Sequence, residues 1–254
     1  MQVIDALFKY FLKGNFNKII KLKNIHLNES CYIFGDGVSI KYFDLNKFSN
    51  FTSISSGKIY LHNDFSKLKC KYVVSCDPLW LTPFFLSIKN KYGSDPLSKN
   101  RKFLKYDPLS NHLKNFIIQH QDINFITDIS SLLFNYSKNI FHISKYAKQF
   151  PLNNLFFELN SHNYFGQTLP TSICLAIYLG FTNIYLVGCD YTHFPSRNSH
   201  WFENQVPNLY YKKNIDYMKS FFDNAKEFVN IKTITLDGSS KNIKYETYEK
   251  FTNS

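Results

Sequence analysis

Arginine is nearly absent from this chain. Of its 30 basic residues only Arg101 and Arg197 are arginines, although the formal net charge is +11. Arginine is the side chain best suited to bidentate contacts with bases and phosphates. A lysine-rich charge without arginine therefore argues against sequence-specific recognition, and we expect no nucleic-acid partner. The charge still favours other phosphate-bearing partners, such as anionic lipids and nucleotide-activated substrates.

The chain also shows no paired cysteines, no long apolar runs and no signal-peptide pattern. The five cysteines form no C-x-x-C pair, and their odd number argues against a disulfide framework. No segment reaches the ~20 apolar residues that a membrane-spanning helix needs. Lys9 and Lys13 interrupt the apolar N-terminal run, which is unlike a signal peptide. We therefore expect free cysteines and a reducing, cytoplasmic location.

Three common catalytic signatures are absent as well. The chain has no G-x-S-x-G nucleophile elbow, no G-x-x-x-x-G-K-[ST] phosphate loop and no H-E-x-x-H zinc motif. These absences argue against serine-hydrolase, P-loop and zinc-protease chemistry. We expect no metal site.

The chain does contain a regular alternation of short apolar strands and helices. Strands are expected at 31–34, 51–61 with a break at Gly57, 72–75, 123–126, 139–143, 183–187 and 232–236. Helices are expected at 1–22, directly after Gly37, and at 128–138, 169–180 and 208–229. This alternation indicates an α/β fold with a mostly parallel central sheet flanked by helices. We predict a single Rossmann-like domain over 26–240, an N-terminal helix over 1–25 and a polar tail over 241–254.

The N-terminal segment combines an apolar stripe with lysines. Val3, Leu7, Tyr10 and Phe11 share one face at helical spacing, and lysines surround that face. One interpretation is a helix that packs on the domain or on a second subunit of a homo-oligomer. The other is a peripheral anchor at the inner face of the bacterial cytoplasmic membrane, because a basic amphipathic helix suits an anionic lipid surface.

Three expected strand ends carry an aspartate, namely Asp36, Asp77 and Asp190. The carboxyl ends of parallel strands meet at one edge of a sheet, where ligands bind, so the three acids should converge there. Aspartate also favours turns, and each of these residues has a purely structural explanation. The strand–glycine–helix pattern at Gly35–Ser39 could in addition present backbone N–H groups to a phosphate.

His200, in a polar loop beyond Asp190, is the candidate general base. Histidine suits this role because an imidazole exchanges protons near neutral pH. Asp190 or Glu203 could orient the ring, and Trp201 could offer a stacking face to a sugar or a base. His193 is the competing candidate.

Several of these segments, in this order, resemble one family. They are Gly35-Asp36-Gly37-x-Ser39, the strand ending at Cys76-Asp77-Pro78, the helix from Thr171-Ser172 to Gly180, the strand ending at Gly188-Cys189-Asp190, and Asn198-Ser199-His200. Over most of its length the chain resembles the bacterial CMP-sialic acid sialyltransferases that decorate lipooligosaccharide. It also resembles the wider group that shares their fold, including motility accessory proteins and 6-hydroxymethylpterin pyrophosphokinase-like proteins.

The resemblance implies a metal-independent glycosyltransferase of surface-glycan synthesis, such as lipopolysaccharide or capsule. It would move a sugar from a nucleotide donor, CMP-linked, to a glycan or lipid-linked glycan acceptor, with no further cofactor. The catalytic residues implied are His200 and Asp190. The nucleotide-binding residues implied are Gly35, Asp36, Gly37, Ser39, Gly57, Asp77, Thr171, Ser172 and Tyr191. The chain departs from the family at Asp36 and Gly57, where the family pattern has asparagines.

Two alternatives stay open. In a nucleotide-dependent pyrophosphokinase, Asp36, Asp77 and Asp190 would hold Mg²⁺ against the phosphates of ATP. In a non-catalytic assembly or binding protein, the same fold would persist without a nucleotide pocket. Metal dependence with ATP binding favours the first alternative, and binding of no nucleotide favours the second.

Overall fold

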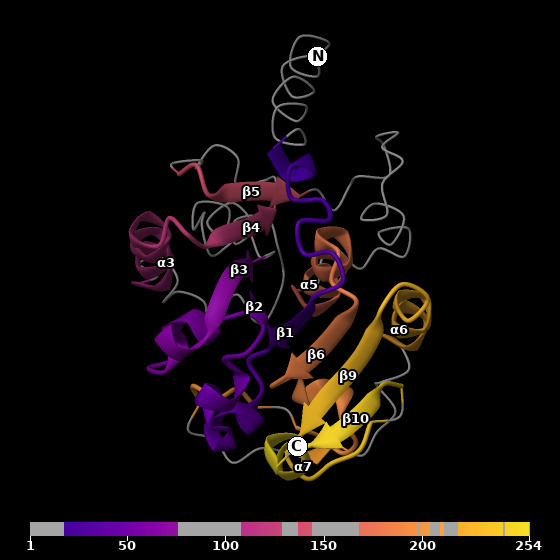
Figure 1. The fold of residues 1–254 in the computed structure, drawn as a ribbon. Coiled ribbons are helices and arrows are strands. Elements are labelled where there is room, and N and C mark those ends of the chain that lie inside the picture. The colour runs from indigo at the N-terminus through magenta and orange to yellow at the C-terminus, as the bar shows by residue number, and fades with distance from the viewer. Residues whose placement is uncertain are drawn as a thin grey trace, which may run out of the picture.

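The computed structural model describes residues 18–75, 108–128, 137–143, 168–197, 199–203, 209–210, 218–240 and 242–253. Its centre is an eight-stranded sheet in the order β10-β9-β6-β1-β2-β3-β4-β5, and every neighbouring pair is parallel (Figure 1). The strands are β1 (Ser30–Phe34), β2 (Thr52–Ser56), β3 (Lys69–Ser75), β4 (Asn124–Asp128), β5 (Ile140–Ile143), β6 (Asn183–Val187), β9 (Asn230–Thr235) and β10 (Lys244–Thr247). The predicted α/β Rossmann-like class, with a parallel sheet flanked by helices, is confirmed.

Helices cover both faces of this sheet, and β1 shows why its sequence is apolar throughout. Cys31 and Ile33 pack into the core that contains α5 (Thr168–Leu179) and α6 (Lys219–Ala225). Tyr32 and Phe34 belong to the opposite core. That second core includes residues of α3 (Pro108–Gln119) and is flanked by α7 (Tyr248–Asn253). A parallel strand buried on both faces has no solvent side to place polar residues on.

Helix α5 carries the chain back to the middle of the sheet, where β6 joins β1. All its residues from Leu169 to Leu179 are buried. It ends as the sequence predicts, because Gly180 takes φ 98°, a conformation that costs glycine little. The nitrogen of Gly180 donates to the Ile177 carbonyl, and that of Phe181 donates to the Ala176 carbonyl. This pair of bonds is a Schellman motif, which satisfies carbonyls at the helix end.

Four expectations about the elements are corrected. The second strand does not resume after Gly57, since β2 ends at Ser56 and a 3₁₀ turn, Ile59–Leu61, follows. The helix expected after Gly37 is a five-residue 3₁₀ turn, Val38–Tyr42. Within 208–229 the described helix is α6 alone, and Leu209–Tyr210 forms β8, paired with β7 (Ser196–Arg197).

The fourth correction concerns the end of the chain. Residues 241–254 were expected to be a polar tail beyond the last strand, but they contain β10, which pairs in parallel with β9. α7 then packs Tyr248 and Phe251 against the core. Both elements are rich in polar residues because each keeps a side that faces solvent. Their apolar contacts therefore could not be predicted from composition.

Most of the predicted N-terminal helix lies outside the described residues. At its described end Ile19 is 2% exposed, and the Lys18 ammonium donates to the Ile140 carbonyl at 2.6 Å. These contacts tie residues 18–19 to the sheet. Among the described helices, none has the length and apolarity to cross a bilayer. The four described cysteines, Cys31, Cys70, Cys174 and Cys189, are buried and free, as expected.

Candidate functional site

The candidate site lies where the chain changes direction in the sheet. From β1 the chain proceeds to β2 on one side, whereas from β6 it proceeds to β9 on the other. The connections that follow the neighbouring strands β1 and β6 therefore lead to opposite sides of the sheet. Such a switch point leaves a crevice that is the usual ligand site of open parallel sheets.

The two loops approach each other closely, and glycines permit this. The nitrogen of Gly35 donates to the Val187 carbonyl at 2.8 Å, and that of Gly37 donates to the Gly188 carbonyl at 2.7 Å. A Cβ atom on Gly35 would lie 2.5 Å from the Gly188 oxygen, and one on Gly37 would lie 2.6 Å from the Asp190 carboxyl carbon. The Gly-x-Gly pattern thus serves contact between loops.

Asp190 clamps the same two loops together. Its Oδ2 accepts the backbone N–H of Ser39 at 2.8 Å, and its Oδ1 accepts the Ser39 hydroxyl. Asp190 is 1% exposed and Ser39 is fully buried. Their polar groups bond to each other, which gives both residues a structural role, whereas the catalytic role expected of Asp190 and the nucleotide contact expected of Ser39 stay predictions.

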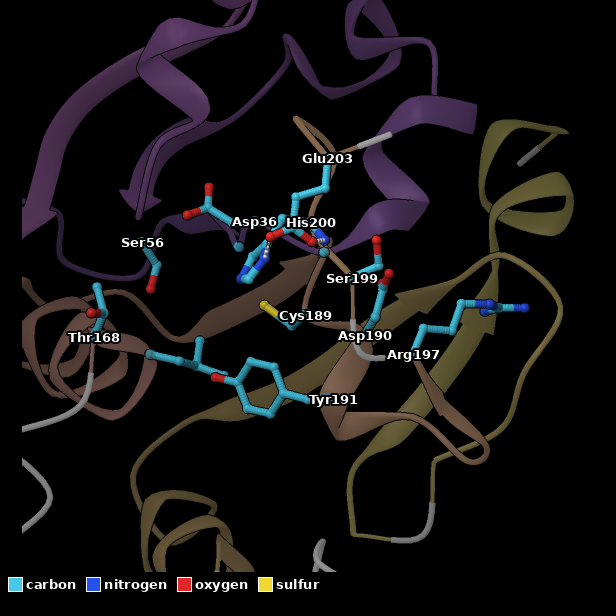
Figure 2. Close-up of a pocket in the computed structure, with 13 residues that line it drawn as sticks. Asp36, Ser56, Thr168, Cys189, Asp190, Tyr191, Arg197, Ser199, His200 and Glu203 are labelled. Atoms are coloured by element: carbon cyan, nitrogen blue, oxygen red, sulfur yellow. Dashed lines mark hydrogen bonds and ion pairs between the residues drawn. The ribbon is translucent and has the colours of Figure 1, made fainter. Parts of the chain in front are cut away.

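A pocket of about 610 Å³ opens at this point, and Figure 2 shows its labelled side chains. It is lined by Gly35, Asp36, Gly37, Ser56, Thr168, Leu169, Cys189, Asp190, Tyr191, Arg197, Ser199, His200 and Glu203. These residues come from the ends of β1, β2 and β6, from the start of α5, and from the loop that carries His200. The sequence prediction that acids and a histidine meet at one sheet edge therefore holds for Asp36, Asp190 and His200.

His200 and Glu203 form a hydrogen-bonded pair in the lining of the pocket. The Nδ1 of His200 lies 3.0 Å from the Glu203 Oε1, and the backbone N–H of His200 donates to Oε2 at 3.0 Å. These bonds lower the pKa of Glu203 and keep it ionised. The ring also stacks on Phe202, with centroids 5.1 Å apart and planes 12° apart. Of the two residues that could orient His200, the structure identifies Glu203.

This geometry favours one tautomer of the neutral ring. A carboxylate at Nδ1 favours the tautomer with hydrogen there, which leaves Nε2 as an acceptor. Among the described residues, none bonds to Nε2. The His200 side chain is 53% exposed, and its ring points into the space between Asp36 and Cys189 (Figure 2). His200 can therefore accept a proton from a bound ligand.

Asp36 is the second polar group that the pocket presents. Its Oδ1 accepts the backbone N–H of Lys58 at 2.7 Å and the Trp201 indole N–H at 3.4 Å. Burial raises the pKa of Asp36, an effect that these bonds and the Lys58 charge partly offset. Gly57, at φ 134°, lies directly against the carboxylate, since a Cβ atom there would come within 2.2 Å of Oδ2.

Trp201 does not offer the stacking face that the sequence suggested. Its backbone N–H donates to the Asp36 carbonyl at 3.1 Å, and its ring packs against the core and the edge of His62. The exposed aromatic rings beside the pocket are instead Tyr191 and Phe202, each 40% exposed. Tyr191 was predicted from the sequence, but Phe202 was not.

Several predicted residues lie elsewhere. Thr171 and Ser172 are fully buried within α5, and the Ser172 hydroxyl donates to the Thr168 carbonyl. Gly57 shapes the pocket only through Asp36, and Asp77 lies outside the described residues. His193 is fully buried, with Nε2 2.9 Å from the Thr233 hydroxyl, so the competing base has no access to a ligand.

The sequence argument did not assign six of the lining residues: Ser56, Thr168, Leu169, Cys189, Arg197 and Ser199. Ser56 and Cys189 lie at the ends of predicted strands. They could have been predicted by the same argument as Asp36, namely that ligands bind where the carboxyl ends of parallel strands meet. Thr168 and Leu169 form the start of the predicted α5, one turn before the residues chosen. Ser199 was quoted only as context for His200, and no sequence signal marked its burial.

Carboxylates outnumber cationic groups among the described residues that line the pocket. Asp36, Asp190 and Glu203 line it, whereas Arg197 pairs with Asp237 and directs its guanidinium away from the centre (Figure 2). The described residues include no group of three potential metal ligands. The pocket thus differs in sign from the chain as a whole. Comparisons with protein-family models, curated proteins and solved structures found no match.

Proposed function

We propose that the protein is a glycosyltransferase that moves a sugar from a nucleotide donor to the hydroxyl group of a cell-surface glycan. One observation carries the proposal: an imidazole held by a carboxylate at Nδ1 presents Nε2 to a pocket at the switch point of a parallel sheet. The resemblance to CMP-sialic acid sialyltransferases motivates a CMP-linked donor.

The proposed reaction is a direct displacement at the anomeric carbon. Nε2 of His200 removes the proton of the acceptor hydroxyl as its oxygen attacks that carbon. The bond from the anomeric carbon to the phosphate oxygen breaks, and the nucleotide leaves with the bonding electrons. Glu203 stabilises the imidazolium that forms, because an ionised carboxylate lies 3.0 Å from its Nδ1.

The nucleotide would not use the Gly35–Ser39 turn as first expected. The N–H groups of Gly35, Gly37 and Ser39 already bond to Val187, Gly188 and Asp190. The other backbone feature at the pocket is the start of α5, where Thr168 and Leu169 line it. The N-terminus of a 12-residue helix carries partial positive charge, which suits the donor phosphate better than the three lining carboxylates do.

The pyrophosphokinase alternative has less support from these contacts. It needs carboxylate oxygens available for Mg²⁺, but both Asp190 oxygens accept bonds from Ser39, and Oδ1 of Asp36 accepts two N–H bonds. A thermal-shift screen of CMP, UDP, GDP and ATP, with and without Mg²⁺, separates the two functions. Stabilisation by CMP without Mg²⁺ supports the transferase, whereas stabilisation only by ATP with Mg²⁺ contradicts it.

Turnover of His200→Gln tests the base directly. Hydrolysis of CMP-N-acetylneuraminate and UDP-glucose, with water replacing the unknown acceptor, is the measured reaction. Loss of a general base typically lowers the rate about 10²–10⁴-fold. We expect that loss in His200→Gln and none in His112→Gln, which changes an exposed histidine of α3. Equal turnover in both variants would remove His200 from the mechanism.

A further inference from the structure

Ser199 has a buried hydroxyl that bonds to none of the described residues. The residue is 6% exposed and lines the pocket beside His200. A buried hydroxyl without a partner loses its bonds to water and gains none in return, which destabilises the folded protein. Such a group at a ligand pocket calls for an explanation that a group elsewhere in the core does not.

The backbone around Ser199 is held in place. His200 pairs with Gly37 in an isolated antiparallel bridge, and the next N–H, that of Trp201, donates to the Asp36 carbonyl. The position of the Ser199 Cβ atom is therefore set by the loop after β1. Ser199 lines the pocket, and rotation of χ1 between staggered positions can change the direction of its hydroxyl without moving the backbone.

The charges around Ser199 select the kind of group that it can bind. Among the described residues that line the pocket, Asp36, Asp190 and Glu203 carry carboxylates, and the guanidinium of Arg197 is paired with Asp237. A phosphate or carboxylate next to these acids would be repelled, because like charges in a partly buried site interact strongly. A hydroxyl is uncharged and can both donate and accept a bond, as can serine itself.

We propose that Ser199 Oγ binds a hydroxyl group of an uncharged sugar and so positions that sugar beside Nε2 of His200. The inference rests on the proposed function, which it deepens by placing the sugar at the His200 end of the pocket. Ser199 acts as a positioning residue for the transfer reaction. It also sets specificity, since a site built to bond a hydroxyl discriminates against ligands that lack it.

The chain provides a matched control in Ser53. Its hydroxyl is likewise buried without a partner among the described residues, but Ser53 belongs to β2 and does not line the pocket. Ser199→Ala and Ser53→Ala each delete one buried, unpartnered oxygen. We expect neither variant to melt below the wild type, because the deletion removes an unfavourable group without removing a bond.

The two variants should differ in binding. The probes are the methyl glycosides of glucose, galactose and N-acetylglucosamine, and inorganic phosphate, titrated onto the full chain and followed by ligand-observed NMR. We expect at least one glycoside to bind the wild type and Ser53→Ala alike, and to bind Ser199→Ala roughly three- to tenfold more weakly, as loss of one hydrogen bond predicts. Phosphate affinity should be the same for all three proteins.

Three results would overturn the inference: no glycoside binds the wild type, glycoside affinity is equal in all three proteins, or phosphate is the probe that Ser199→Ala loses. A fall in melting temperature confined to Ser199→Ala would also count against it, since the hydroxyl would then have a structural bond. Failure here is distinct from failure of the proposed function. Unchanged glycoside affinity with turnover that still depends on His200 removes only the role of Ser199.

Discussion

Ser39 donates two hydrogen bonds to the carboxylate of Asp190, one from its backbone nitrogen and one from its hydroxyl. The two residues belong to the loops after β1 and β6, which are neighbours in the sheet but far apart in the sequence. The bonds hold the floor of the pocket closed at the switch point. Asp36 and His200 therefore line a pocket whose base is held in place by these bonds.

Replacing Asp190 should therefore lower stability. Asp190→Ala leaves both Ser39 donors buried without an acceptor, and we expect the free energy of unfolding in urea to fall by about 3 kcal/mol. Asp122→Ala is the control, because Asp122 is exposed and its ion pair with Lys71 contributes less than about 1 kcal/mol. An Asp190→Ala protein as stable as this control would show that the clamp contributes little.

His193 should make stability fall in acid. Burial lowers its pKa from 6.5 to about 4, against the opposing charge of Asp190, whose Oδ1 lies 3.9 Å from Nδ1. The unfolded chain therefore binds more protons between these pH values, and lowering the pH favours unfolding by about 3 kcal/mol over that interval. Below pH 4 this group adds no further loss.

Urea unfolding at pH 7 and pH 4.5 measures the effect. His193→Gln keeps a side chain that can bond to Thr233 but does not titrate, so its stability should depend less steeply on pH. His112→Gln, which alters an exposed histidine, should keep the wild-type dependence. If the free energy of unfolding fell equally with pH in the wild type and in His193→Gln, the pH dependence would not come from His193.

Glu203 should affect turnover more than stability. Glu203→Gln can still accept the N–H of His200, but it cannot balance the charge of an imidazolium. We expect donor hydrolysis to slow roughly 10- to 100-fold, with Glu203→Asp partly restoring it. Glu246→Gln removes the ion-pair partner of Lys232 on β9 and should leave turnover unchanged. Full activity in Glu203→Gln would show that the contact between Glu203 and His200 does not contribute to turnover.

Gly57 should not tolerate a side chain. Gly57→Ala places a Cβ atom 2.2 Å from the Asp36 Oδ2 on a backbone with φ 134°, so we expect a loss of roughly 2–4 kcal/mol in unfolding free energy. Gly238→Ala is the matched control, since the nearest atom to its Cβ would lie 3.6 Å away. Equal melting temperatures for the two variants would show that Asp36 moves aside freely.

The sequence predicted the architecture well because a buried parallel strand is apolar throughout. β1 and β6 were found by their apolar runs, and α5 by Pro170 near its start and Gly180 at its end. β10 was not predicted, because Lys244–Thr247 is an edge strand in a polar segment. Lys244 and Tyr245 of β10 are exposed to water, so the composition of this strand resembles that of a loop.

The site was predicted in outline, and its roles were harder to assign. A strand-end rule placed Asp36 and Asp190 at one edge, but it could not distinguish the carboxylate that faces the pocket from the one that holds Ser39. That difference depends on a long-range contact. Glu203 stayed one of two options for the same reason, and Ser199 became a candidate only once its burial was known.

The contact between Gly57 and Asp36 also bears on how this site can change over evolutionary time. Position 57 must lack a side chain for the carboxylate of Asp36 to keep its orientation. A protein with a longer residue at 57 would need a different residue, or a different rotamer, at 36. The two positions should therefore covary among homologues, so that a lineage exchanging Gly57 for an amide also exchanges Asp36, and with it the ligand group that the pocket selects.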